Sequence, residues 1–412
     1  MNNTKDQIYD IAIIGGGIAG AGIARDAAMR GMQTVLFEAR TFGSGTSSKS
    51  SKLIHGGIRY LELSWVALCR GAFAEAWKNF RFVFLSLREC RTLEKIAPKL
   101  VRPIDLIIPI YHSDPRRPLT IYLGAILYSL LALLSGDLRT PKIFTSKKSI
   151  LKKLPSLAPE NLAGGILIRD HTTDDLALVE ATIASAVKNG AKAFENTKVT
   201  GFEYDFEKNI YKIQTGGNTS GFFYARKLLN ATGPWVDKTR ELLHNKEYDE
   251  NLIEPIAGSH ITLKRFLPYS VILQAEDGRL FFVISRGEEA RVGTTEWRCE
   301  DPDQAKPTET DVTYLLNSLS KYFPFQKFRR EDILSSDAGV RPLAKPRRNT
   351  RENEISREHE IRVDHSGVIH VLGVKLTDHR RAAEEIVSEL VPELRRYNPA
   401  IKTKTSTHRV QL

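Results

Sequence analysis

Along the first forty residues, the pattern of hydrophobic positions changes from that of a strand to that of a helix and back to that of a strand. Residues 8–14 (IYDIAII) form a short, β-branched apolar run, which is typical of a strand buried on both faces of a parallel sheet. Residues 15–31 begin with a glycine turn and continue as an alanine-rich helix that ends at Gly31. Residues 33–40 (QTVLFEAR) supply a second strand, which ends at Glu38. This order predicts a βαβ unit at the start of the chain.

Helical and extended patterns then alternate along the rest of the chain. Helices are predicted over residues 64–98, 119–135, 174–190, 308–322 and 378–394. Extended segments are predicted over residues 100–112, 191–205, 209–215, 224–230 and 367–375, with an antiparallel sheet over 253–299. Residues 335–354 are rich in charge and proline, and they are predicted to form a surface loop.

These blocks favour an α/β fold with two interleaved domains, because 412 residues exceed what one ordinary core needs. We expect a Rossmann-like domain that is assembled from residues 1–98, 165–245 and 335–412. We expect a substrate or cap domain with an antiparallel sheet, assembled from residues 99–164 and 246–334, which includes the apolar segment 119–135.

Charge and cysteine content narrow the classes of partner. The formal net charge is +11, which favours anionic partners such as phosphorylated small molecules or an anionic membrane surface. No module or stacking-aromatic motif for nucleic acid is present, so we expect no nucleic-acid partner. Cys69, Cys90 and Cys299 are far apart and odd in number, which argues against a disulfide framework and against a thiolate metal site.

A dinucleotide site is predicted at the first turn. Gly15, Gly17 and Gly20 satisfy the spacing G-x-G-x-x-G directly after a strand and before a helix, where glycines permit a tight turn and the close approach of a pyrophosphate. The helix N-terminus presents unpaired N–H groups to the phosphates. Glu38 follows 18 residues after Gly20 and can accept both ribose hydroxyls, which indicates NAD or FAD rather than NADP.

The stretch GSGTSSKSSKLIHGGIRYLE, residues 43–62, carries polar chemistry that a core does not need. Its hydroxyl groups can donate hydrogen bonds to phosphate or to a flavin edge, and they belong to Thr46, Ser47, Ser48 and Ser51. The Gly56-Gly57 pair lets the backbone lie against a flat ring. Together with NATGPWV (230–236) and GVRPL (339–343), this stretch resembles the FAD-dependent glycerol-3-phosphate dehydrogenases of the D-amino acid oxidase-like flavoproteins.

The resemblance covers residues 8–395 and implies a fold, a cofactor and a reaction. It implies that the Rossmann-like domain binds FAD and that the enzyme oxidises sn-glycerol 3-phosphate to dihydroxyacetone phosphate. The hydride passes to flavin N5, and the electrons pass to membrane quinone. The implied substrate-site residues are His55, Arg59, Tyr60, Arg341 and Lys375, of which His55, Arg341 and Lys375 are catalytic. The implied contacts to FAD further include Leu53, Gly56, Thr232, Gly233, Gly373, Lys375, Leu376 and Thr377.

The chemistry of these side chains agrees with a phosphorylated alcohol as substrate. Arg59 and Arg341 offer guanidinium forks that bind a phosphate dianion in a bidentate manner. Oxidation of an alcohol also needs an acceptor for the hydroxyl proton, and we hypothesise that His55 is this base. Lys375 lies at a strand-to-helix junction whose N–H groups can stabilise negative charge on the reduced flavin.

The chain departs from the family pattern at several positions. Val374, Asp378 and His379 stand in GVKLTDHR where the family has GGKLTTYR, Glu296 replaces an aspartate, and Ala257 replaces a lysine. The sequence ends at Leu412, and we expect the chain to lack the helical C-terminal domain that many members carry. Two alternatives therefore stay open. One is an oxygen-using amine or hydroxy-acid oxidase of the same superfamily, and the other is a non-catalytic flavin-binding relative.

The apolar segment 119–135 is flanked by basic residues, which are Arg116, Arg117, Arg139, Lys142, Lys147 and Lys148. This pattern fits a helix that lies in the interface of an anionic bilayer, although a buried helix of the cap and a membrane span are alternatives. The N-terminus has too short an apolar run for a signal peptide. We expect a cytoplasmic protein attached peripherally to the inner face of the cytoplasmic membrane, with its oligomeric state open and a homodimer among the options.

Overall fold

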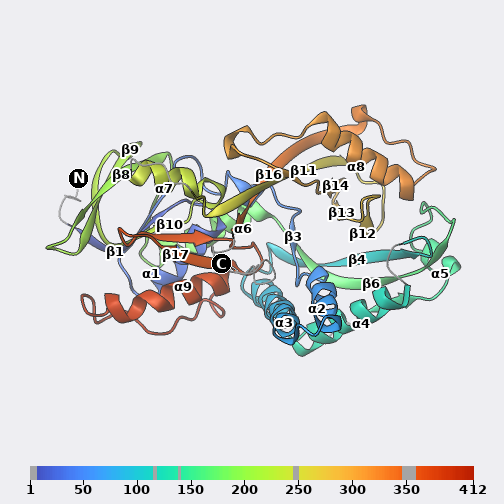
Figure 1. Cartoon of the computed structure of the whole chain (residues 1–412), viewed down its shortest axis with the longest axis horizontal. Coiled ribbons are helices and arrows are strands. Elements are labelled where there is room, and N and C mark those ends of the chain that lie inside the picture. Colours follow the sequence, from blue (N-terminus) through green and yellow to red (C-terminus); the bar gives the residue numbers. More distant parts are fainter. Residues whose placement is uncertain (1–6, 115–117, 138–140, 245–249, 346–358) are drawn as a thin grey trace.

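The structure is a computed structural model that describes residues 7–114, 118–137, 141–244, 250–345 and 359–412. Two large sheets lie side by side, one on the left and one on the right of Figure 1, and the chain passes between them several times. Each sheet therefore draws its strands from distant parts of the sequence.

The first sheet has eight strands and a parallel centre. Its main order is β17-β18-β10-β1-β2-β7, with β9 and β8 continuing from β10. Its strands are β1 (Ile8–Ile14), β2 (Thr34–Phe37), β7 (Lys192–Phe194), β8 (Thr197–Asp205), β9 (Ile210–Gly217), β10 (Gly221–Asn230), β17 (Glu360–Val363) and β18 (Ile369–Leu372). Its helices are α1 (Ile18–Met29), α6 (Asp175–Lys188), α7 (Val236–His244) and α9 (His379–Leu394). Helix α1 packs against both α6 and α9, and apolar side chains from all three join the buried cluster around β1.

The second sheet has ten strands and is largely antiparallel. Its main order is β15-β11-β14-β13-β12-β4-β6-β3, with β16 added to β11 and β5 added to β6. Its strands are β3 (Leu53–Ile54), β4 (Val101–Tyr111), β5 (Lys142–Phe144), β6 (Leu162–Thr173), β11 (Ile253–Lys264), β12 (Ser270–Gln274), β13 (Leu280–Arg286), β14 (Glu289–Gly293), β15 (Trp297–Arg298) and β16 (Ile333–Ala344). The remaining α-helices are α2 (Arg59–Cys69), α3 (Phe73–Ile96), α4 (Pro118–Leu134), α5 (Lys147–Leu151) and α8 (Glu309–Tyr322).

Most elements agree with the sequence pattern, and two predictions need correction. The expected loop over residues 335–354 is wrong in its first part, because residues up to Ala344 form β16, which pairs with β11 along its length. Proline and charge misled the prediction, since β16 lies at one edge of β11, with residues 334–336 exposed and only residues 338–340 buried. The predicted helix over residues 64–98 is two helices, because Gly71 takes a φ of +75° between α2 and α3.

The predicted α/β fold with an antiparallel cap is confirmed, and the domain boundaries remain a proposal. Strands β6 and β16 lie in the second sheet although residues 165–173 and 335–344 were expected in the Rossmann-like domain. Strand β3 was also expected in the Rossmann-like domain, but it pairs with β6 at the edge of the second sheet. We therefore propose cap boundaries that include these three strands, because their backbone hydrogen bonds go to cap strands.

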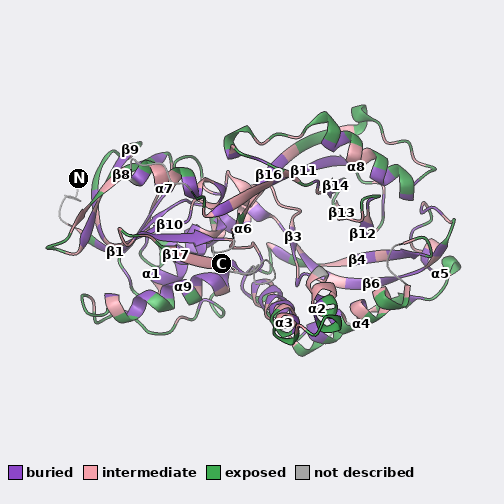
Figure 2. Cartoon of the chain, in the orientation of Figure 1, coloured by how far each residue is buried: buried purple, intermediate pink, exposed green. Residues whose placement is uncertain are grey.

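Helix α4 coincides with the apolar segment 119–135. One face of α4 is buried against the cap, and its residues are Ala125, Tyr128, Leu131 and Ala132. The opposite face is exposed, as Figure 2 shows, and carries Leu119, Leu123, Leu127, Leu130, Leu133 and Leu134. Among the described helices, none is long and apolar enough to cross a membrane. Of the basic flanks, Arg116, Arg117 and Arg139 lie outside the described residues.

Candidate active site

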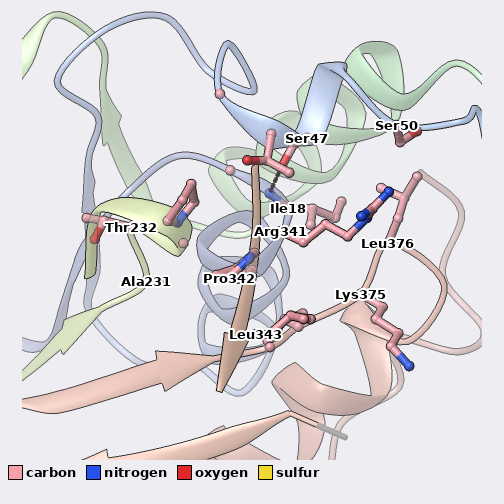
Figure 3. Close-up of a pocket in the computed structure, with 18 of the residues that line it drawn as sticks. Ile18, Ser47, Ser50, Ala231, Thr232, Arg341, Pro342, Leu343, Lys375 and Leu376 are labelled. Carbon is pink, nitrogen blue, oxygen red and sulfur yellow. Dashed lines mark hydrogen bonds between the residues drawn. The ribbon is translucent and has the colours of Figure 1, made fainter. Parts of the chain in front are cut away.

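A cavity of about 1400 Å³ runs between the two sheets and gathers most of the predicted site residues. Those that line it are Gly15, Gly17, Glu38, Thr46, Ser47, Ser51, Leu53, His55, Tyr60, Thr232, Gly233, Arg341, Gly373, Lys375, Leu376 and Thr377. Figure 3 shows part of this lining, with Arg341 on β16 and with Lys375 and Leu376 after β18. Gly20, Ser48 and Gly56 do not line the cavity, and the side chain of Arg59 lies outside the described part of the structure.

The glycines of the first turn form a cradle that a side chain would fill. Gly15 has a φ of +106°, and a Cβ there would lie 2.6 Å from the carbonyl oxygen of Ala231. A Cβ on Gly20 would lie 1.9 Å from the carbonyl oxygen of Gly15. Gly20 therefore lets α1 pack closely on the turn. Gly15 and Gly17 leave room in the cavity for the pyrophosphate of a dinucleotide to approach the protein backbone.

Glu38 lies at the end of β2 and holds the turn in place. Its Oε2 accepts a hydrogen bond of 2.7 Å from the N–H of Gly16, and its Oε1 accepts one of 2.8 Å from the N–H of Arg40. Each carboxylate oxygen has a second lone pair, so binding of ribose hydroxyls is compatible with these bonds.

The hydroxyl groups of residues 46–51 anchor their loop to several elements. Ser47 Oγ accepts a hydrogen bond of 3.0 Å from the N–H of Ile18, the dashed line in Figure 3, so its own proton stays available to a ligand. Thr46 donates to the carbonyl of Val340 over 2.7 Å, and Ser48 donates to that of Gly45 over 3.2 Å. The loop is thus prearranged, with Ser48 serving its conformation and not the cavity.

His55 lies beside the cavity in its neutral form. Burial of the ring, and to a smaller extent the positive charge of nearby Lys375, lowers the pKa of His55 to about 4. The N–H of Gly57 donates to His55 Nδ1 over 3.0 Å, which places the proton of the neutral ring on Nε2. The N–H of Gly56 donates over 2.9 Å to the hydroxyl of Tyr128 on α4, so the Gly-Gly pair fixes the ring and ties its loop to the cap.

Two cations from distant elements face the cavity. Lys375 donates to the hydroxyl of Tyr60 over 2.7 Å, and its Nζ lies 4.1 Å from the ring centroid of Phe82, a cation–π contact. Arg341 Nη2 donates to Thr294 Oγ1 over 3.1 Å, and its Nη1 lies 3.3 Å from Glu296 Oε1. Both side chains are therefore held in position by neighbours before an anion binds.

The departures in GVKLTDHR fit the local backbone. Gly373 takes a φ of +68°, whereas Val374 is not among the residues with positive φ, so its Cβ imposes no strain. The carboxylate of Asp378 turns to Ser86 on α3, which donates to both of its oxygens over 3.0 Å and 3.1 Å. Burial raises the pKa of Asp378, which weakens the expected opposition to a reduced, anionic flavin.

Sequence reasoning missed a second group of cavity residues at the Glu38 end. These residues are Arg40, Trp235, Lys238 and Asp303. Arg40 directly follows the β2 region and could have been noticed there, but Asp303 comes from residues far along the chain that only the fold brings to this place. Phe82 was also missed, because a phenylalanine in a helix pattern indicates core packing.

Comparison with known proteins decides the family. Residues 10–396 match the family described as FAD dependent oxidoreductase (DAO). The chain belongs to this family. It is 36% identical over 404 residues to the aerobic glycerol-3-phosphate dehydrogenase of Staphylococcus haemolyticus, which covers 95% of this chain and 69% of that protein. The same enzyme of Bacillus subtilis is 34% identical over 393 residues, with 94% and 67% covered. The resemblance found in the sequence motifs is thereby confirmed.

Solved structures that are similar to this chain support the flavoprotein fold and FAD as the cofactor. Glycerol-3-phosphate dehydrogenase from Bacillus halodurans, complexed with FAD, is 28% identical with a TM-score of 0.75, covering 99% of this chain and 68% of that chain. L-alpha-glycerophosphate oxidase from Mycoplasma pneumoniae has a TM-score of 0.69 at 18% identity, covering 98% of this chain and 99% of that chain, a likeness of fold alone. The glycine cradle, Glu38 and the long cavity fit FAD, which is the cofactor of this family.

Proposed function

We propose that this flavoprotein oxidises sn-glycerol 3-phosphate to dihydroxyacetone phosphate. The observation that carries the proposal is that Arg341 and Lys375 face one cavity with His55, although they come from distant segments. The 36% identity to an aerobic glycerol-3-phosphate dehydrogenase supports the same reaction. When bound, FAD supplies the hydride acceptor, its N5 atom.

Phosphate binding is assigned to the cations of the cavity. Arg341 offers a planar fork for two phosphate oxygens, and Lys375 offers a point charge that Tyr60 and Phe82 already hold. Arg59, at the start of α2, is proposed as a further phosphate ligand from the resemblance in IHGGIRYLE. The two cations that neighbours hold in position, Arg341 and Lys375, favour a dianion over an amine, which argues for the dehydrogenase and against an amine oxidase.

His55 is proposed to take the hydroxyl proton as the hydride leaves C2. Its low pKa keeps the ring neutral at physiological pH, the state that a base requires. Because Nδ1 accepts the N–H of Gly57, we propose that bound substrate displaces this N–H and that Nδ1 then accepts the proton. His55 would receive the hydroxyl proton, while the hydride from C2 would be taken up by FAD when it is bound.

The exposed leucines of α4 support a proposal on the electron acceptor and the location. The apolar face of α4 and the exposed aromatic residues Trp65, Phe73 and Trp77 of α2 and α3 provide a surface that an anionic bilayer would cover. Lys142 on β5 and Lys147 and Lys148 on α5 follow α4 in the chain and add positive charge, and Tyr122 of α4 donates to the carbonyl of Phe144 on β5 over 3.0 Å. We propose that the protein is attached peripherally at the cytoplasmic face of the membrane, where quinone accepts the electrons.

The half-reaction tests the proposed function directly. Glycerol 3-phosphate is added to the purified holoprotein without oxygen while flavin absorbance is followed. Loss of the absorbance of oxidised flavin supports the proposal. A flavin that stays oxidised with glycerol 3-phosphate, but is reduced by another hydroxy or amino acid, overturns the substrate and leaves the family assignment intact.

A further inference from the structure

Asp303 joins side chains from two other segments at the Glu38 end of the cofactor cavity. It belongs to the short 3-10 turn Pro302–Gln304, which lies between β15 and α8. Its carboxylate forms an ion pair with Arg40, and its Oδ1 accepts a hydrogen bond of 3.0 Å from the indole N–H of Trp235. Its Oδ2 lies 3.6 Å from Lys238 Nζ. One carboxylate therefore connects the second sheet's side of the cavity with the β2 and α7 regions of the first.

The neighbouring contacts hold this arrangement together. Arg40 lies over the Trp235 ring, with its guanidinium carbon 5.4 Å from the ring centroid. Lys238 makes a second ion pair of 2.6 Å with Asp301, whose Oδ1 also accepts the backbone N–H of Asp303 over 2.9 Å. The turn that carries Asp303 is therefore fixed relative to Lys238 as well as to Arg40.

The position of this group indicates a role in holding the cofactor. Arg40, Trp235, Lys238 and Asp303 all line the same cavity. The backbone N–H of Arg40 also donates to Glu38, the residue expected to bind the adenosine ribose. We propose that Asp303 is a positioning residue for FAD that closes the adenosine end of the cavity by joining Arg40, Trp235 and Lys238. The bound FAD then leaves only when these contacts open.

The test is the rate of FAD release, which does not depend on the substrate. Holoprotein is diluted into an excess of the apo form of an FAD-dependent oxidase, which captures released FAD, and the release is followed by the oxidase activity that the trap gains. D303N keeps the size of the side chain and an acceptor for Trp235 but removes the charge that holds Arg40 and Lys238. We expect D303N to release FAD about three to ten times faster than the wild type.

One control variant and two further variants make the outcome specific to the contacts of Asp303. E331Q breaks the exposed Arg329–Glu331 ion pair of 2.9 Å, in which neither residue lines the cavity, so it should release FAD at the wild-type rate. R40Q removes the Arg40 partner of the Asp303 carboxylate, on the first sheet's side of the cavity. It should accelerate the release of FAD without changing the fold of the turn that carries Asp303. The double variant R40Q/D303N should be no faster than the faster single variant, because both remove the same contact.

Salt gives an independent readout on the unmodified protein. The ion pairs are partly exposed, so 0.5 M salt, a condition of our choosing at which the Debye length is about 4 Å, should accelerate release from the wild type more than from D303N. Equal release rates for wild type, D303N and R40Q would overturn the proposal. So would acceleration by E331Q as large as that by D303N. Failure of glycerol 3-phosphate to reduce the flavin would overturn the proposed function and leave this inference standing.

Discussion

Arg341 Nη1 lies 3.3 Å from Glu296 Oε1, so the guanidinium proposed to bind phosphate already has a carboxylate partner. Thr294 Oγ1 accepts from the other nitrogen over 3.1 Å. An incoming phosphate dianion competes with Glu296 for the same guanidinium, because both offer paired anionic oxygens. We therefore expect Glu296, which stands where the family pattern has an aspartate, to lower the affinity for substrate.

We expect E296Q to lower the KM for glycerol 3-phosphate by about three- to tenfold while leaving kcat within twofold, since an uncharged amide competes less well for Arg341. Steady-state kinetics with an artificial electron acceptor measures both constants. The matched control is E296D, which introduces the aspartate of the family pattern. Because this variant keeps a negative charge beside Arg341, its KM should stay close to the wild-type value. A KM for E296Q at or above the wild-type value would contradict this account.

Lys375 depends on Tyr60 for its position. The hydroxyl of Tyr60 accepts a hydrogen bond of 2.7 Å from Nζ, and the Tyr60 ring centroid lies 4.5 Å from the same nitrogen. Y60F removes the hydrogen bond and keeps the ring, so we expect the KM to rise about five- to tenfold with a smaller change in kcat. Titration of the oxidised holoprotein with inorganic phosphate gives a second measure of the same loss. Unchanged affinity in both measurements would remove Tyr60 from the phosphate site.

The sequence predicts those parts of the fold and site that depend on local signals. The turn at Gly15 and the strand that ends at Glu38 follow from glycine spacing and apolar periodicity, both of which act over a few residues. The family motifs locate His55 and Lys375, and the cavity brings them together.

What the sequence misses depends on long-range pairing or on side-chain direction. Strand β16 was mistaken for a loop because its edge position on β11 tolerates Pro342 and charged side chains. Asp303 and Phe82 reach the cavity through tertiary packing, which no local pattern encodes. The turning of Asp378 toward Ser86 is a choice of side-chain conformation, and it weakens the effect expected from the carboxylate's place in the sequence.

The cradle at the first turn predicts which glycine the cofactor requires. A Cβ on Gly20 would lie 1.9 Å from the carbonyl oxygen of Gly15, so G20A must shift α1 away from the turn. We expect G20A to purify without FAD, as measured by the ratio of absorbance at 450 nm, where oxidised flavin absorbs, to that at 280 nm. Gly124 on α4 has open space for a Cβ, and G124A should keep full FAD content. Full FAD content in G20A would show that the turn adapts.

Acid should destabilise the protein through buried histidine. Burial, with opposition from the Leu376 carbonyl, lowers the pKa of His379 to about 4, whereas the unfolded chain has a value near 6.5. Because the unfolded state binds the proton more strongly, the contribution of His379 to stability is complete above about pH 6.5. It is lost as the pH falls toward 4, by up to about 3 kcal/mol. His55 acts in the same direction, while the raised pKa of Asp378 opposes it.

Calorimetric unfolding at pH 7.5 and pH 5, two conditions of our choosing, measures this effect. H379Q keeps a donor for the Leu376 carbonyl but cannot be protonated, so its Tm should fall less between the two conditions than that of the wild type. H408Q changes an exposed histidine and should follow the wild type. Parallel curves for H379Q and the wild type would show that His379 does not contribute to the acid sensitivity.

The exposed face of α4 predicts how membrane attachment can be weakened without damage to the fold. Leu123 is 58% exposed and Leu130 is 51% exposed, so serine at both positions removes apolar surface that the folded protein does not bury. We expect the L123S/L130S variant to bind anionic liposomes at least tenfold more weakly than the wild type in sedimentation, with an unchanged rate of flavin reduction. Leu334 on β16 is 60% exposed and lies away from α4, so L334S should bind as the wild type does. Equal loss of binding in both variants would mean that general surface apolarity drives the association, and unchanged binding in L123S/L130S would exclude α4 as the docking surface.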